Sequence, residues 1–194
     1  MNSNCFARLI YLIRSDLWRY AGRAGLLTFL KSLLLGVGFK YSFWMRLDGY
    51  FSGKSKFWLM PKILTKLILH HYMFKFGISI AGMTDIGPGF YIGHFSNIVI
   101  SPYARIGANC NISQGCTIGR SNRGKRKGTP TLGDNVYIGP GAKLFGNITI
   151  GNNVAIGANA VVNKDVPDNA VVAGIPAEVI SYGGSEGMVN KTDY

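Results

Sequence analysis

The chain has 194 residues, enough for one or two domains, and its 21 Lys+Arg against 9 Asp+Glu give a formal net charge of +12. Charged residues interrupt its most apolar region, which argues against a membrane-spanning helix of roughly 20 residues. The amino end lacks the basic-then-apolar order of a secretory signal. Three cysteines without metal-like spacing predict no metal site and a reduced, cytoplasmic chain.

Residues 1–77 are predicted to form a helical and strongly basic region. Apolar residues recur at helical spacing over residues 6–17, over residues 26–35 and again after Pro61. Twelve basic side chains accompany two acidic ones here, a balance of +10. We expect a cap that covers the first coil of a repeat structure. A further contact of residues 1–76 with anionic lipid, as a peripheral protein at the inner face of the membrane, is left open. Nucleic acid is not expected, because no binding motif accompanies the charge.

Large aliphatic residues recur every six positions between residues 78 and 180. The three series are Ile80, Ile86 and Ile92; Ile100, Ile106, Ile112 and Ile118; and Leu132, Ile138, Leu144, Ile150, Ile156 and Val162. A period of six fits neither a helix nor a simple strand. It predicts short strands that turn corners and stack into a parallel β-helix, with the glycine after each aliphatic residue supplying the corner torsions. A loose Gly-rich β-sandwich is the alternative.

Two interruptions of this period mark the expected site. The step from Ile92 to Ile100 is eight residues, and the step from Ile118 to Leu132 is fourteen. The longer step predicts a loop over residues 119–131, which carries Arg120, Arg123, Lys125, Arg126 and Lys127. Insertions in a solenoid leave the coil on one face, which is commonly the binding face.

The motifs at these interruptions resemble those of the hexapeptide-repeat acyltransferases, in particular the serine O-acetyltransferase branch and its relatives in polysaccharide biosynthesis. Residues 91–94 (Tyr-Ile-Gly-His) are similar to that branch's apolar-X-Asp-His segment, and residues 128–130 (Gly-Thr-Pro) to its loop ending in Arg-His-Pro. The resemblance covers about residues 78–180, and more loosely residues 14–17. It implies a mainly β fold, a left-handed parallel β-helix of hexapeptide repeats with an N-terminal α-helical cap domain.

The same resemblance implies an acetyl-CoA-dependent enzyme that needs no metal and forms a homotrimer, with active sites between neighbouring subunits. Whether two trimers join through the cap to form a dimer of trimers is left open. The tail over residues 181–194 is expected to be mobile or wrapped along a neighbouring subunit.

His94 is the catalytic base that the resemblance implies, since a neutral imidazole suits proton removal near pH 7. Basic side chains on the loop would attract the phosphates of coenzyme A, and family positions along a groove would meet its pantetheine arm. The predicted coenzyme contacts are Gly119, Arg123, Lys125, Arg126, Lys127, Gly139, Pro140, Lys143, Ala158 and Lys164. The predicted acceptor contacts are Tyr91, Phe95, Asn97, Asn111, Gln114 and Thr129.

The acceptor is predicted from two departures from the family pattern. Gly93 stands where the serine-acetylating branch has an acid, and Gly128-Thr129 stands where it has Arg-His. A zwitterionic acceptor such as serine would lose both of the charged side chains that bind it in that branch. We therefore predict acetylation of a sugar hydroxyl, free or lipid-linked, in polysaccharide or exopolysaccharide biosynthesis. The alternatives are a serine O-acetyltransferase of cysteine biosynthesis with a relocated substrate site, and a non-catalytic binding or scaffold protein.

Overall fold

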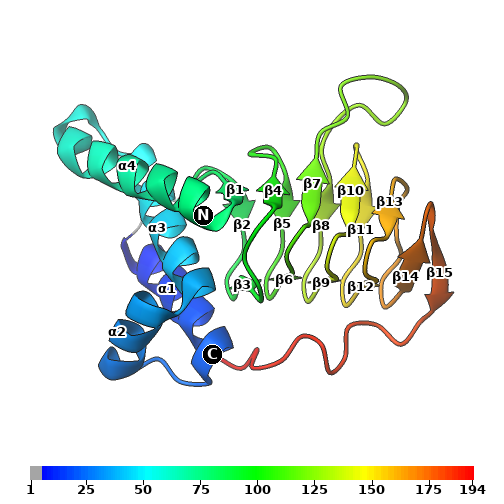
Figure 1. Ribbon diagram of the computed structural model, residues 1–194, viewed down its shortest axis with the longest axis horizontal. Coiled ribbons are helices and arrows are strands. Elements are labelled where there is room, and N and C mark those ends of the chain that lie inside the picture. The colour runs from blue at the N-terminus through cyan, green and yellow to red at the C-terminus, as the bar shows by residue number, and fades with distance from the viewer. Residues whose placement is uncertain (1–5) are drawn as a thin grey trace.

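A computed structural model describes residues 6–194 as a helical cap joined to a three-sided β-helix (Figure 1). The cap consists of α1 (Phe6–Ala21), α2 (Leu26–Leu35), α3 (Val37–Ser52), a short 3₁₀ helix (Lys56–Trp58) and α4 (Leu59–Phe76). Within the described residues no single helix is long and apolar enough to cross a bilayer. Only α2 and α3 taken together reach that length and composition, and the two helices meet at a bend of 103°.

The β-helix is built from three sheets, whose strands come from successive coils, and the antiparallel β15 is added to the third sheet. Sheet A contains β1 (Ile78–Ile80), β4 (Ile98–Ile100), β7 (Thr117–Gly119), β10 (Lys143–Phe145) and β13 (Val161–Val162). Sheet B contains β2 (Asp85–Ile86), β5 (Arg105–Ile106), β8 (Thr131–Leu132) and β11 (Thr149–Ile150). Sheet C contains β3 (Tyr91–Ile92), β6 (Asn111–Ile112), β9 (Tyr137–Ile138), β12 (Ala155–Ile156), β14 (Val171–Gly174) and β15 (Ala177–Ser181). All pairings are parallel except β14 with β15, so the predicted parallel β-helix is confirmed.

The six-residue period places each large aliphatic residue over its equivalent in the next coil. Ile112 pairs in register with Ile138, and Ile118 with Leu144, and all four are buried. The small residues that lie four positions after each aliphatic residue also point inward and fill the space between the aliphatic side chains, as the pattern predicts. Among these, Cys110 and Cys116 are fully buried; burial raises the pKa of the Cys110 thiol to about 12 and raises that of Cys116 as well.

At the corners of the β-helix, the residue that adopts left-handed backbone torsions is not the one that was predicted. The glycine that directly follows each aliphatic residue is needed for close approach: a Cβ on Gly107 would lie 2.5 Å from the Gly133 carbonyl oxygen of the next coil. The left-handed torsions fall two residues later, on asparagines such as Asn109 and Asn135, with φ of 58° and 57°. Side-chain amides link these asparagines from coil to coil, at 3.0 Å between Asn109 and Asn135.

The cap is fixed to the first coil by a buried ion pair. Arg46 on α3 holds both carboxylate oxygens of Asp16 on α1, at 3.0 and 3.1 Å. The same guanidinium donates to the carbonyls of Ile86 and Gly87, and the Phe90 N–H donates to Asp16 at 2.8 Å. The two charges therefore tie two helices to the corner between sheets B and C.

The C-terminal tail, expected to be mobile or wrapped along a neighbouring subunit, runs back along its own coils (Figure 1). The Ser185 N–H donates to the carbonyl of Asn153 at 3.0 Å, and Asn111 donates to the carbonyl of Met188 at 2.8 Å. At its end, Asp193 accepts a hydrogen bond from the Trp18 indole of α1 at 3.1 Å. The tail is thus a strap from the last coil to the cap.

Candidate active site

His94 lies at the corner where the chain passes from sheet C to sheet A. The ladder continues through this corner, because the Gly93 N–H donates to the Ile112 carbonyl at 2.9 Å. Equivalent bonds join the following coils, from Ser113 N–H to the Ile138 carbonyl at 3.1 Å and from Gly139 N–H to the Ile156 carbonyl at 2.8 Å. The corner positions of successive coils therefore form a column, consisting of His94, Gln114, Pro140 and Ala158.

The two additional residues after Ile92 form an outward bulge. Ser96 and Asn97 both have positive φ, 90° and 53°, which is unusual for residues other than glycine. Such torsions persist where surrounding contacts hold them, and here the Ser96 carbonyl accepts a bond from Gly115 N–H at 2.9 Å. The bulge leaves His94 exposed, while the ring of Phe95 lies 6.0 Å from that of Phe76.

His94 opens onto a pocket of about 370 Å³ between sheet C, α1 and the C-terminal strap. Its lining consists of Arg19, Tyr20, Tyr91, Gly93, His94, Asn111, Ile112, Ser113, Tyr137, Met188, Asn190 and Lys191. No acidic side chain is among these described residues, and two are permanent cations at neutral pH. The pocket is therefore positively charged.

Arg19 lies buried at the floor of this pocket, with no carboxylate partner among residues 6–194. Its guanidinium donates to the carbonyls of Asn190 and Gly89, at 2.7 and 2.9 Å, and to the side-chain oxygen of Asn111 at 2.6 Å. Burial lowers its pKa, but an arginine stays protonated at any physiological pH. Its charge is neutralised by no ion pair within the described residues.

The predicted acceptor residues are brought together only in part. Tyr91 and Asn111 line the His94 pocket, although the Asn111 side chain is already held by Arg19 and Met188. Gln114 lies one coil further along, and its buried side-chain oxygen has no hydrogen-bond partner within the described residues. Phe95 and Asn97 are exposed on the bulge. Thr129 lies at another corner and donates to the Tyr103 carbonyl at 2.9 Å.

The basic loop forms a hairpin that projects from the β-helix after β7 (Figure 1). Ser121 and Gly128 close it with paired backbone bonds of 2.9 Å. Arg123, Lys125 and Lys127 are exposed, whereas Arg126 forms an ion pair with Asp165 at 3.1 Å. The hairpin leaves at the corner between sheets A and B, so sheet A separates it from His94 of the same chain.

The remaining residues predicted to contact coenzyme A are small residues at or near the corners and two lysines that already have protein partners. Pro140 and Ala158 belong to the column, with Ala158 exposed. Gly139 is buried one residue before Pro140, and Gly119 ends β7. Lys143 donates to the Gly115 carbonyl and to the Thr117 hydroxyl, and Lys164 pairs with Glu178 at 2.6 Å. Both lysines have protein partners that a phosphate would have to replace.

The exposed loop charges give a direct test of coenzyme binding. Replacing Arg123, Lys125 and Lys127 with Ser should raise KM for acetyl-CoA roughly tenfold at low salt, since charge-assisted bonds to phosphate are lost. The effect should shrink as salt is added. Steady-state kinetics at two ionic strengths measure this, with Arg8→Ser, Lys56→Ser and Lys75→Ser on the cap as the charge-matched control. An unchanged KM at low salt would show that the loop charges are only solvated.

Arg19, Ser113, Tyr137 and the strap residues were not predicted from the sequence. Ser113 stands at the corner position that Gly93 occupies one coil earlier, so the six-residue period could have found it. Arg19 and Lys191 carry no local signal, because they reach the pocket only through the docking of α1 and the return of the tail.

Residues 129–164 match the family described as bacterial transferase hexapeptide (six repeats). The chain is 35% identical to the serine acetyltransferase of Bacillus pumilus (strain SAFR-032) over 133 aligned residues. The aligned region covers 69% of this chain and 59% of that protein. The chain thus spans about three fifths of that relative.

Solved serine acetyltransferases share the fold of cap and β-helix. The crystal structure from Brucella abortus strain S19 in complex with coenzyme A superimposes with a TM-score of 0.76 at 26% identity, over 91% of this chain and 69% of that one. A truncated serine acetyltransferase apoenzyme superimposes with a TM-score of 0.73 at 30% identity, over 90% of this chain and 71% of that one.

These relatives overturn the predicted sugar acceptor, its lipid-linked form and the assignment to polysaccharide biosynthesis, because they are serine acetyltransferases. The prediction failed because it considered only the two anchors missing at Gly93 and at Gly128-Thr129. It could not include cations that the fold brings from distant segments. By sequence and by structure, the chain belongs to the hexapeptide-repeat transferases.

Proposed function

We propose that the chain is an acetyl-CoA-dependent serine O-acetyltransferase in which His94 is the general base. The observation that carries the proposal is an exposed imidazole at the head of the corner column, in a pocket with two cations and no acidic side chain. The similarity to serine acetyltransferases supports the same reaction class.

His94 would act at both ends of the transfer. Its imidazole accepts the proton of the acceptor hydroxyl as that oxygen attacks the thioester carbonyl carbon. When the tetrahedral intermediate collapses, the carbon–sulfur bond breaks and the imidazolium returns the proton to the departing sulfur. The products are an ester and a free thiol, and His94 is regenerated as the neutral base.

The residues present fit coenzyme A. The corner column offers the exposed Ala158 and the half-buried Pro140 along one edge, and the hairpin offers Arg123, Lys125 and Lys127 for phosphates. Within one chain sheet A separates these two parts. A homotrimer would join them, with the hairpin of one subunit placed over the corner column of the next, and we propose this assembly.

The acceptor's carboxylate would be bound by Lys191, and the buried Arg19 would attract it by its charge alone. Among the described residues the Lys191 ammonium donates only to the Tyr20 carbonyl, at 3.3 Å and near solvent, so it can turn towards a bound anion. Arg19 adds an uncompensated charge beneath it. Together they supply, from α1 and the strap, the positive charge that the family's Arg-His pair would supply from the loop.

The proposed activity is tested with the full chain, acetyl-CoA and L-serine. Thiol release should depend on serine, and mass spectrometry should detect O-acetylserine. L-alanine, which has no hydroxyl, is the blank that measures thioester hydrolysis. Thiol release that is equal with serine and alanine would overturn the proposed function.

Lys191→Met should raise KM for L-serine about tenfold, because a charge-assisted contact to the carboxylate is lost. KM for acetyl-CoA should not change. L-serinamide, which lacks the carboxylate, should be used equally well by the variant and the natural sequence. An equal loss for serine and serinamide would mean that Lys191 only supports the fold of the strap.

A further inference from the structure

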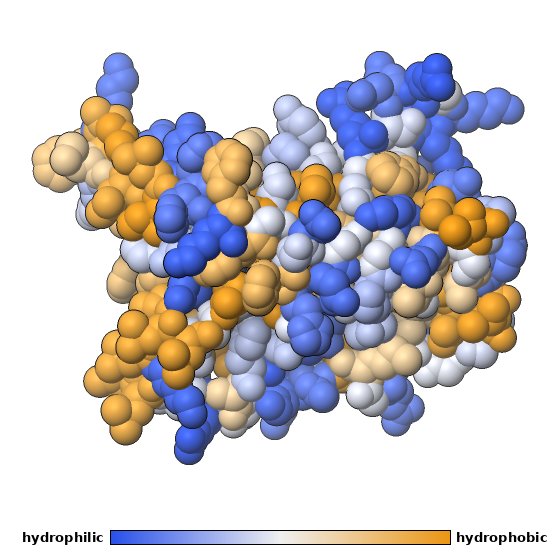
Figure 2. Space-filling model, in the orientation of Figure 1, coloured by the Kyte–Doolittle hydropathy of each residue, from blue (hydrophilic) through white to orange (hydrophobic). Residues whose placement is uncertain are grey.

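α2 presents an apolar face that the described protein leaves uncovered. None of its ten residues is buried, and the sequence LLTFLKSLLL contains a single charge. Leu26, Leu27, Leu34 and Leu35 are 71–83% exposed. Exposed patches of this kind mark interaction sites, since isolated apolar residues are normal on a surface but contiguous ones are not. Figure 2 shows this patch at the end of the molecule away from the β-helix.

The exposed charges of the cap around this face have one sign. Both acidic residues of the described cap, Asp16 and Asp48, are buried. Its exposed and half-exposed ionised side chains are therefore all basic, and they include Lys31 on α2 and Arg23 and Lys40 beside it. Charge complementarity thus requires an anionic partner.

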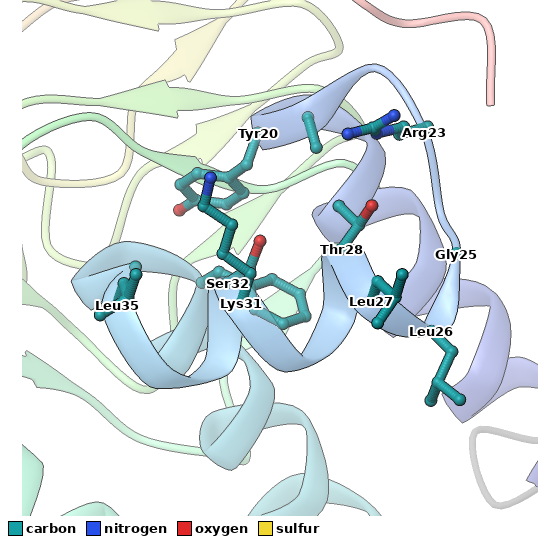
Figure 3. Close-up of a pocket in the computed structure, with 12 residues that line it drawn as sticks. Tyr20, Arg23, Gly25, Leu26, Leu27, Thr28, Lys31, Ser32 and Leu35 are labelled. Atoms are coloured by element: carbon teal, nitrogen blue, oxygen red, sulfur yellow. The ribbon is translucent and has the colours of Figure 1, made fainter.

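A hollow of about 770 Å³ lies between α2 and the end of α1. Leucines from α2 and Phe39 supply its apolar lining, and Arg23 and Lys31 supply charge. Figure 3 shows the nitrogen-bearing ends of Arg23 and Lys31 on one side of the hollow, with Leu26 pointing away from them. Apolar and cationic groups are therefore side by side, an arrangement typical of surfaces that lie at a lipid interface.

We infer that α2 docks the protein on an anionic lipid bilayer, with its leucines among the upper acyl chains and the neighbouring bases at the phosphate level. This peripheral contact goes beyond the proposed acetyl transfer. A second copy of the chain does not fit the face as well, because a two-fold contact would oppose the same basic surface to itself. Nucleic acid would satisfy the charge but leave the leucines in water.

The inference is tested by co-sedimentation of the full chain with vesicles. Binding to 70% phosphatidylcholine with 30% phosphatidylglycerol should exceed binding to phosphatidylcholine alone at least tenfold. It should weaken with added salt. Arg23→Gln, Lys31→Gln and Lys40→Gln together should lower the partition coefficient by roughly fivefold per base.

The apolar contribution is tested separately. Leu26→Ser, Leu27→Ser and Leu34→Ser together should reduce vesicle binding at least tenfold, since each loses an exposed side chain that the lipid would bury. Ile175→Ser with Ile180→Ser, two equally exposed residues at the far end of the β-helix, is the control and should bind as before.

Two outcomes would overturn the inference. One is vesicle binding of the leucine variant equal to that of the natural sequence. The other is failure of the natural sequence to bind vesicles. Size-exclusion chromatography then checks for a larger assembly that the leucine variant breaks. That result would assign the face to a second copy. Neither outcome affects the serine assay, which is run without lipid.

Discussion

Replacing His94 with Ala is expected to lower kcat by roughly 10²–10⁴-fold, the usual contribution of a positioned general base. The imidazole is exposed at the head of the corner column, so its loss removes proton transfer without disturbing a buried contact. Steady-state thiol release with L-serine measures the effect. KM for acetyl-CoA should stay close to its original value, since the loop and the column are untouched.

His70→Ala is the matched control for this prediction, because it removes an exposed imidazole from α4, away from the pocket. It should leave kcat unchanged. Circular dichroism and size-exclusion chromatography should give the same fold and assembly for both variants. Turnover of His94→Ala at the original rate would remove this residue from the mechanism and leave the pocket without a base.

Replacing Arg46 with Met is expected to lower the free energy of unfolding by about 3–5 kcal/mol. The change leaves the buried Asp16 carboxylate without its bidentate partner and leaves the Ile86 and Gly87 carbonyls without their donor. Urea unfolding followed by circular dichroism measures the loss. Asp16→Leu combined with Arg46→Met should recover much of it, since an apolar pair needs no charge compensation.

The loss caused by Arg46→Met should also depend on pH. Burial raises the pKa of Asp16, and Arg46 opposes that rise. Without Arg46 the pKa of the folded state rises further, so the folded protein binds a proton more tightly than the unfolded chain. Stability is then greatest near and below the ordinary value of 3.8 and is lost as pH rises. The deficit should be smaller at pH 5 than at pH 8.

Glu178→Gln provides the contrast. The ion pair of Glu178 with Lys164 is exposed to solvent and screened, so its loss should change stability by less than about 1 kcal/mol. Equal losses for the buried and the exposed pair would show that Asp16 and Arg46 do not fix the cap.

The β-helix could be predicted because its information is local and repeated. Each six-residue repeat, which forms one side of a coil, needs one large and one small inward side chain, and Ile112 and Cys110 show that pair within a few residues. The interruptions could also be located, since a fixed period makes any excess visible. The same pattern could not tell close approach from positive φ, which is why the torsions were assigned to Gly107 and not to Asn109.

The composition of the pocket could not be predicted, because its parts are distant in the chain. Arg19 reaches Asn111 across ninety-two positions, and it does so only because Asp16 and Arg46 dock α1 against the first coil. Lys191 arrives from the opposite end of the sequence. The residues around His94, taken alone, therefore indicate lost anchors and a neutral acceptor.

The strap changes how a stack of coils can come apart. In an open solenoid each repeat touches only its neighbours, so an end coil can fray while the rest persists. Here Ser185 is bonded to two different coils, through the Asn153 and Asn135 carbonyls, and Asp193 is bonded to α1. Peeling away the final coil would also release contacts near the cap. The strap thus links the two ends of a linear array of coils. Cooperativity of unfolding between two coils therefore no longer has to decline with their distance along the axis.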